Sequence, residues 1–145
     1  MSDLDSPSVT DLGGASSVEV RTSASAALIP TIRAVASDLA ARADFDLDAI
    51  SDLRMAVDEA CATLVDAADP TSQLQCRFLV RPERIRVHAE VQSAKPDMVL
   101  STDTFWWRVL QTLADEVEVL HEPATAGRPA TVGIRLDKTA GDEPR

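Results

Sequence analysis

The stretch DEACATLVDAADP, residues 58–70, has the pattern of the second half of an amphipathic helix. Apolar residues recur at intervals of three and four and therefore share one face of a helix running from about residue 48 to residue 68: Leu53, Val57, Ala60 and Leu64. Pro70 is expected to end this helix, because proline has no backbone N–H and clashes with a preceding helical turn.

The polar side of the same helix carries a line of carboxylates. Asp52, Glu59 and Asp66 follow one another at seven-residue intervals, and Thr63 lies between this line and the apolar face. The spacing allows two interpretations. The carboxylates either form a solvated helix face or point into a shallow cleft beside a sheet.

The rest of the chain alternates between strand-like and helix-like patterns. Outside this helix, strands are predicted at 17–24, 74–80, 84–91, 116–122 and 130–138, and helices at about 26–43 and 104–115. Paired strands with helices between them predict an α+β fold, a two-layer sandwich of one mixed, mainly antiparallel sheet with the helices on one face. Residues 1–16 are expected to be disordered, 17–136 to form the domain, and 137–145 to form a flexible tail.

Composition narrows the classes of function. The chain has 145 residues, enough for one domain with a core, and its formal net charge of -10 disfavours direct binding of nucleic acid. The same charge suits a basic protein partner. No apolar run is long enough to span a membrane, and the acidic, polar start lacks the features of a signal peptide, so a cytoplasmic location is expected.

Cysteine and histidine give weak signals. Cys61 falls in a helix pattern and Cys76 in a strand pattern, so the pair is either two small buried hydrophobes or a redox pair. His88 and His121 lack the spacing of metal ligands, and no metal site is expected.

Two segments resemble a known family. Residues 26–70 contain DLRMAVDEACATLVDAA, which is similar to the helix DIKIAVSEACTNAVQHA typical of anti-sigma factors of the RsbW and SpoIIAB type. RVLQTLADEVEV, residues 108–119, resembles the LIxTLMDEVEV of the same family. These proteins belong to the GHKL superfamily, which includes the ATPase domains of histidine kinases, and their sandwich is of the GHKL (Bergerat) type. The resemblance covers about residues 17–136 and is strongest to the divergent UsfX-like branch.

The resemblance implies three activities: binding a sigma factor, binding an anti-anti-sigma (STAS-type) protein, and phosphorylating that antagonist with ATP. Glu59 matches the catalytic glutamate of the family. Thr63 stands where the family has the magnesium-binding asparagine, and Ala67 stands where it has a histidine. Glu59, Thr63 and Asp66 are therefore the candidate cofactor-binding residues.

The glycines that this ATP site requires are missing. The chain has five glycines, and none lies between residues 15 and 126, where the family has a D-x-G-x-G turn and a glycine-rich lid. Glycine serves there because backbone N–H groups must approach phosphates without an intervening side chain. One lid glycine corresponds to Trp106 here. We therefore expect a degenerate site in which ATP and magnesium bind weakly or not at all.

The expected partner-binding residues are Arg33, Ser37 and Trp107. Arg33 and Ser37 are predicted opposite an apolar stripe of the first helix, beside small exposed residues that permit close approach of another chain; the stripe is Leu28, Ile32, Val35 and Leu39, and the small residues are Ala34, Ala40 and Ala41. In the last helix Trp106 is predicted to join Phe105 in the core, whereas Trp107 falls toward a polar side and is either packed or a partner contact.

The sequence thus predicts an anti-sigma factor that sequesters an alternative, stress-response type of sigma factor and is relieved by an antagonist. The alternative is an active serine-protein kinase of the same fold, and a third possibility is a structural subunit without enzymatic activity. The resemblance also implies a homodimer.

Overall fold

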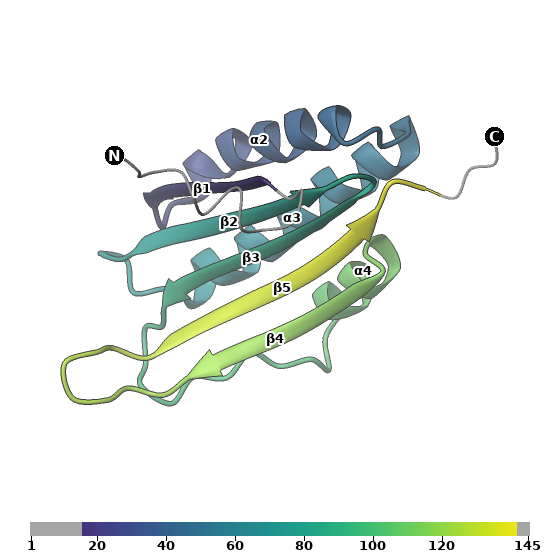
Figure 1. Cartoon of the computed structure of the whole chain (residues 1–145). Helices are drawn as coiled ribbons and strands as arrows, with labels where there is room; N and C mark the ends of the chain where they lie inside the picture. The colour runs from purple at the N-terminus through teal and green to yellow at the C-terminus, as the bar shows by residue number, and fades with distance from the viewer. Residues whose placement is uncertain (1–15, 142–145) are drawn as a thin grey trace, which may run out of the picture.

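The strands and helices follow the order that the sequence predicts (Figure 1). The computed structural model describes residues 16–141, and the N-terminal segment up to residue 15 and residues 142–145 lie outside the described part. In chain order the elements are β1 (Ser16–Ser23), the short 3-10 helix η1 (Ala26–Leu28), α2 (Ile29–Arg42), α3 (Leu47–Ala67), β2 (Gln73–Arg81), β3 (Arg84–Gln92), α4 (Phe105–Leu113), β4 (Glu116–Glu122) and β5 (Thr131–Thr139).

The five strands form one sheet in the order β1-β2-β3-β5-β4. Figure 1 shows α2, α3 and α4 together on one face of this sheet, which confirms the predicted two-layer α+β sandwich. Every neighbouring pair of strands is antiparallel, so the sheet is fully antiparallel, whereas a mixed, mainly antiparallel sheet was predicted. The difference arises at β5, which returns from the edge strand β4 and inserts beside β3.

Helix α3 forms the centre of the helical layer. Asp46 precedes it as N-cap, and its carboxylate accepts a hydrogen bond from the Ala49 N–H at 2.8 Å. The predicted apolar face is confirmed, because its four members are fully or almost fully buried: Leu53, Val57, Ala60 and Leu64. These side chains belong to the same core as the inward-facing residues of β2 and β3, including Phe78 and Val87.

Helix α2 is rotated relative to the expected orientation. Its buried residues are Ile29, Ile32, Ala36 and Ala40, whereas Val35 and Leu39 are only partly buried. The prediction of an exposed Ala40 was therefore wrong, although Ala34 and Ala41 are exposed as expected. The physical reason is that alanines at the buried positions let α2 approach its neighbours closely, and the larger side chains lie at the edge of the contact.

Strand β5 extends past the expected end of the domain. It continues through Thr139, three residues beyond position 136, and both the backbone N–H and the hydroxyl of Thr139 donate hydrogen bonds to the Asp115 carboxylate. The turn before β4 and the end of β5 are thus fixed to each other. Within residues 16–141 no helix is long and apolar enough to cross a membrane.

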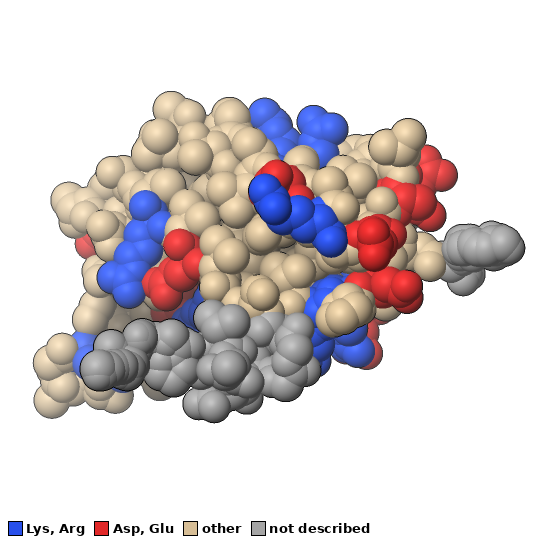
Figure 2. All heavy atoms as spheres, turned by 45° about the horizontal axis from the view of Figure 1, so that its top comes forward, with Lys and Arg blue, Asp and Glu red and all other residues tan. Residues whose placement is uncertain are grey.

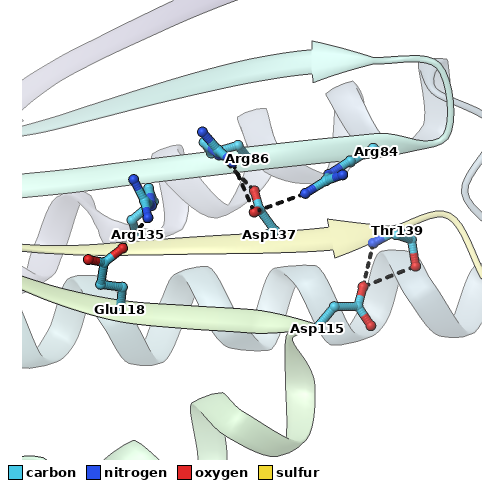
Figure 3. A network of polar contacts seen from close by, with 7 residues as sticks. All are labelled: Arg84, Arg86, Asp115, Glu118, Arg135, Asp137 and Thr139. Atoms are coloured by element: carbon cyan, nitrogen blue, oxygen red, sulfur yellow. Dashed lines mark hydrogen bonds and ion pairs between the residues drawn. The ribbon is translucent and has the colours of Figure 1, made fainter.

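The sheet face opposite the helices carries a network of charged side chains (Figure 3). The Asp137 carboxylate on β5 accepts hydrogen bonds from Arg86 at 2.9 Å and from Arg84 at 3.2 Å, both on β3. Arg135 of β5 forms an ion pair with Glu118 of β4. Opposite charges on neighbouring strands stabilise this register, because directly opposed side chains lie close enough to interact.

On the face seen in Figure 2, the basic side chains lie in separate small groups, some of them beside carboxylates, with uncharged surface between them. Two ion pairs lie on the helices, Arg33–Asp58 and Arg42–Asp38. Phosphate backbones are bound by clusters of Lys and Arg, and the basic groups on the face seen in Figure 2 are separated rather than clustered.

Asp137 differs from the other carboxylates of the network because its side chain is only 5% exposed. Burial by itself raises the pKa of Asp137, but the hydrogen bonds and charges of Arg86 and Arg84 outweigh it and hold the pKa below its ordinary value. A carboxyl whose pKa is depressed in the folded state stabilises the fold above its unfolded pKa and loses that contribution as the pH falls through the folded value.

We predict that Asp137→Asn lowers the free energy of unfolding at pH 7 by about 1–3 kcal/mol, because it removes a charged acceptor that two arginines share. The loss of stability between about pH 5 and pH 2 is expected to be smaller in this variant than in the parent. Glu118→Gln, which removes the more exposed ion pair of the network, serves as the control and is expected to cost about 0–1 kcal/mol. Urea titrations across this pH range measure both, and parallel acid profiles for parent and Asp137→Asn would contradict the assignment.

Candidate functional site

A cleft of about 530 Å³ lies beside the polar side of α3. Glu59, Thr63 and Asp66 all line it, because residues four and seven positions apart lie on one side of a helix. Glu59 and Thr63 are partly buried and Asp66 is exposed. The structure therefore brings the three candidate cofactor-binding residues together at one cleft.

Asp52 does not belong to this cleft. Its carboxylate lies 3.5 Å from the Lys138 ammonium of β5, and it is absent from the cleft lining. Of the three carboxylates on the polar side of α3, Glu59 and Asp66 therefore line the cleft and Asp52 does not. The helical wheel places the three residues on one side, but Lys138, which is 86 positions away in the sequence, engages the first of them.

The opposite wall of the cleft is formed by Met98, Val99, Leu100 and Ser101, which lie between β3 and α4, and by Trp106 of α4. Hydrogen bonds fix the start of this segment to the end of α3: the Ala94 N–H donates to the Ala67 carbonyl at 2.9 Å, and Ser93 forms a β-bridge with Ala68. Met98, Leu100 and Trp106 are partly buried against the core. This wall was not predicted from the sequence, although the apolar run MVL inside a predicted loop indicates a segment that packs against the domain.

The residues at the cleft do not fit a nucleotide. Of the ten side chains that line it, none is Lys or Arg, whereas two are carboxylates that repel phosphates at neutral pH. The three described glycines lie elsewhere: Gly127 is in the β4–β5 loop, Gly133 is within β5, and Gly141 follows β5. An indole at the wall takes space that a phosphate-binding backbone turn requires. A kinase base needs a neighbouring group that holds the phosphate. No Lys or Arg among the residues that line the cleft supplies such a group beside Glu59.

The aromatic residues of α4 lie differently from the prediction. Phe105, which was expected in the core, is 78% exposed, while Trp106 is partly buried. Phe105 is the first residue of a short helix whose buried residue is Leu110, at the helix's other end. Trp107 is partly buried and packs edge-on against Trp106 with ring centroids 5.7 Å apart.

Arg33 and Ser37 lie at the border between α2 and α3. The Arg33 guanidinium donates to the Asp58 carboxylate of α3 at 2.9 Å, and the Ser37 hydroxyl donates to the Arg33 carbonyl at 3.1 Å. Both residues are partly buried. They therefore flank α3 from the α2 side, whereas Glu59 and Asp66 face the cleft that the α4 side completes.

Cys61 of α3 and Cys76 of β2 are both buried. A hydrogen bond between the two thiols, together with burial and the charges of Cys76 and Asp58, raises the pKa of Cys61 well above its ordinary value. A buried thiol that resists deprotonation is a poor nucleophile. Among residues 16–141, no group of three or more His, Cys, Asp or Glu side chains is arranged to hold a metal ion.

Comparison with known proteins agrees with this fold. Residues 22–104, more than half of the chain, match the family described as the histidine kinase-like ATPase domain. The chain is also 34% identical over 140 residues to the protein named anti-sigma-F factor RsbW of Mycobacterium tuberculosis strains CDC 1551 and H37Rv. The alignment covers 94% of this chain and 81% of each relative.

The match spans α3, both strands of the following hairpin and the segment that closes the cleft, and the identity extends over nearly the whole chain. Together with the antiparallel sheet and its one-sided helical layer, these similarities place the chain in a family: it belongs to the RsbW-type anti-sigma factors of the histidine kinase-like ATPase superfamily.

Proposed function

We propose that this chain binds an alternative, stress-response type of sigma factor and keeps it from RNA polymerase until a STAS-type anti-anti-sigma protein competes for the inhibitor. The observation that carries the proposal is the 34% identity, over 94% of the chain, to a protein named anti-sigma-F factor. The net charge of -10 supports it. A sigma factor binds promoter DNA and so presents basic surface, which an acidic partner attracts over long distances.

We further propose that Arg33, Ser37 and Trp107 contribute to the sigma-binding surface. Helix α3 contacts both α2 and α4, so a partner lying across α3 reaches Arg33 on one side and the α4 side on the other. Trp107 supplies a partly buried aromatic ring of the kind that often forms the centre of protein interfaces. The exposed alanines of α2, Ala34 and Ala41, permit close approach of another chain along the same side.

We predict that Arg33→Glu weakens binding of the sigma factor by about tenfold or more, because it removes the guanidinium from the proposed contact and places a carboxylate beside Asp58, which disturbs the border between α2 and α3. Trp107→Ala is expected to cost at least about 1 kcal/mol of binding free energy. Calorimetry first measures the affinity of the parent chain for each purified sigma factor of the same organism. The sigma factor that binds most tightly is then titrated with each variant.

Two controls accompany this experiment. Arg42→Glu makes the same charge change on α2 at an exposed ion pair with Asp38, and it should leave binding within about threefold. Asp58→Ala removes the intramolecular partner of Arg33 and separates loss of that pair from loss of a sigma contact. Parent-like binding by folded Arg33→Glu and Trp107→Ala would move the surface elsewhere, and no binding of any sigma factor by the parent would refute the function.

We also propose that the chain acts without phosphoryl transfer. The carboxylates of Glu59 and Asp66, the indole of Trp106 and the lack of basic side chains in the lining all disfavour a bound triphosphate. Thr63 offers a hydroxyl where the family has an amide, and a hydroxyl has less reach as a magnesium ligand. Glu59 is on this view a remnant of a catalytic position.

We predict that Mg-ATP binds with a dissociation constant no better than high micromolar, about 5–6 kcal/mol of binding free energy. Glu59→Gln combined with Asp66→Asn should leave this weak binding unchanged or strengthen it, because it removes two negative charges, whereas a magnesium-dependent site would lose affinity. Calorimetry measures both. Serine phosphorylation of the antagonist from labelled ATP, abolished by Glu59→Ala, is the result that would establish the kinase alternative.

Finally, we propose that the chain is a homodimer joined through β1. This strand is an edge of the sheet, so one row of its backbone groups faces away from β2. When two copies of β1 pair antiparallel about Val20, Glu19 of each copy lies opposite Arg21 of the other copy. The two-fold symmetry gives two such contacts between opposite charges. The other edge, β4, carries Glu116, Glu118 and Glu122, which disfavour pairing with themselves.

We predict that Glu19→Arg and Arg21→Glu each weaken the dimer by about tenfold, since each opposes like charges at two symmetric places. The double variant restores opposite charges in exchanged positions and should recover the parent dimer. Sedimentation over a range of concentrations measures this, and a double variant no better than the single ones would exclude this register.

A further inference from the structure

The cleft beside α3 combines apolar walls with an acidic edge. Glu59 and Asp66 supply two carboxylates from α3, and Met98, Leu100 and Trp106 supply apolar surface from the opposite side. Among the ion pairs of the described residues, neither Glu59 nor Asp66 has a basic partner. Most other charged side chains of the helices are paired, as Arg33–Asp58 and Lys138–Asp52 show. The cleft therefore offers negative charge that no Lys or Arg within residues 16–141 neutralises in an ion pair.

Large apolar side chains are also exposed around this cleft. Val99, which lines it, is 64% exposed, and Phe105, which precedes Trp106, is 78% exposed. Met55 lies one helical turn before Glu59 on α3 and is 48% exposed. Apolar side chains that gather at one place on a soluble protein mark binding sites more often than scattered ones do.

These two properties define the chemistry of a fitting occupant. An acidic edge attracts a Lys or Arg head group, and the apolar wall accepts the aliphatic stem of such a residue and neighbouring aliphatic side chains. A nucleotide presents the opposite charge to the same edge. A segment that combines basic and aliphatic side chains is typical of proteins that contact nucleic acid, because phosphate binding selects Lys and Arg.

We infer that the cleft between α3 and residues 98–101 is a docking site for a basic, aliphatic segment of the sigma factor, in the place where an ATPase of this superfamily holds its nucleotide. The inference rests on the proposed function and extends it, because it assigns a second surface to the same partner. Arg33 and the cleft lie on the two flanks of α3, and one partner lying across this helix covers both. The inhibitor then occupies a part of the sigma factor that otherwise contacts DNA.

The test reverses the charge of the cleft with Glu59→Lys combined with Asp66→Lys. Sigma-factor binding should weaken by at least about tenfold, because basic groups then face the basic segment. The matched control is Glu83→Lys combined with Glu122→Lys, which changes the net charge equally at two exposed positions, the β2–β3 turn and the end of β4. This control should stay within about threefold of the parent, which separates the cleft from the general effect of net charge.

A second measurement reports on the cleft wall without altering it. The chain has two tryptophans, Trp106 and Trp107, and 5-fluorotryptophan incorporated at both gives two fluorine resonances, which Trp107→Phe assigns. Saturating sigma factor should shift the Trp106 resonance in the parent, and the shift should be lost or weakened in the charge-reversed cleft variant. Thermal unfolding shows whether each variant is folded before binding is interpreted.

The outcomes separate this inference from the function on which it rests. A parent that binds no sigma factor refutes the proposed function and the docking site together. A parent that binds, with cleft and control variants equally tight and an unshifted Trp106 resonance, refutes the docking site alone. Loss of antagonist binding without loss of sigma binding would assign the cleft to the antagonist, and Mg-ATP binding at low micromolar concentration would assign it to a nucleotide; either result overturns the inference.

Discussion

The burial of one face of α3 against the sheet is the contact on which the rest of the molecule depends. Leu53, Val57, Ala60 and Leu64 are removed from water by this contact, and burial of each Leu or Val side chain contributes about 1.5–3 kcal/mol relative to an exposed one. Because the helix can bury only this face, its other sides have fixed directions. Asp58 is set toward α2, where it meets Arg33, and Glu59 and Asp66 are set toward the cleft.

The same constraint explains why a superfamily known for ATP binding can hold a protein with so poor a phosphate site. The fold is stabilised by the apolar face of α3 and the inward residues of the sheet, such as Phe78 and Val87, and none of these residues binds phosphate. The glycine turns are needed for function rather than for the core, so their replacement by side chains leaves the sandwich intact. Apolar residues Met98 and Leu100 pack against the core in the segment that would otherwise be a lid.

Residues with a regular local pattern were the ones that the sequence predicted well. The intervals of three and four in α3 and the alternation in β2 and β3 follow directly from helix and strand geometry, so element order and the α3 core face were predicted. Contacts between residues far apart in the sequence were not predicted. The seven-residue intervals group Asp52 with Glu59 and Asp66, but the ammonium of Lys138 on β5 pairs with Asp52, and no local pattern predicts such a pair.

Three further differences have the same origin. The core face of α2 was placed on its largest residues, yet tight packing favours the alanines Ala36 and Ala40, whose fit depends on the neighbouring helix rather than on their own sequence. Phe105 was placed in the core by its apolarity, but it begins α4 and remains exposed. Residues 137–145 were predicted to form a flexible tail, although the predicted last strand reached residue 138; the arginines of β3 hold Asp137 within the sheet.

An inhibitor that transfers no phosphate must release its sigma factor by mass action. The partner that binds more favourably at the prevailing concentrations occupies the inhibitor, and shifting the inhibitor from 1% to 99% of one complex requires a combined advantage of about 10⁴-fold in affinity and concentration. The proposed surface on helix α3, with Arg33 on one flank and Glu59 on the other, would give an antagonist a simple route to such competition. An antagonist that covers either flank hinders a sigma factor that needs both, so overlap on α3 is sufficient and no change in the conformation of the inhibitor is required.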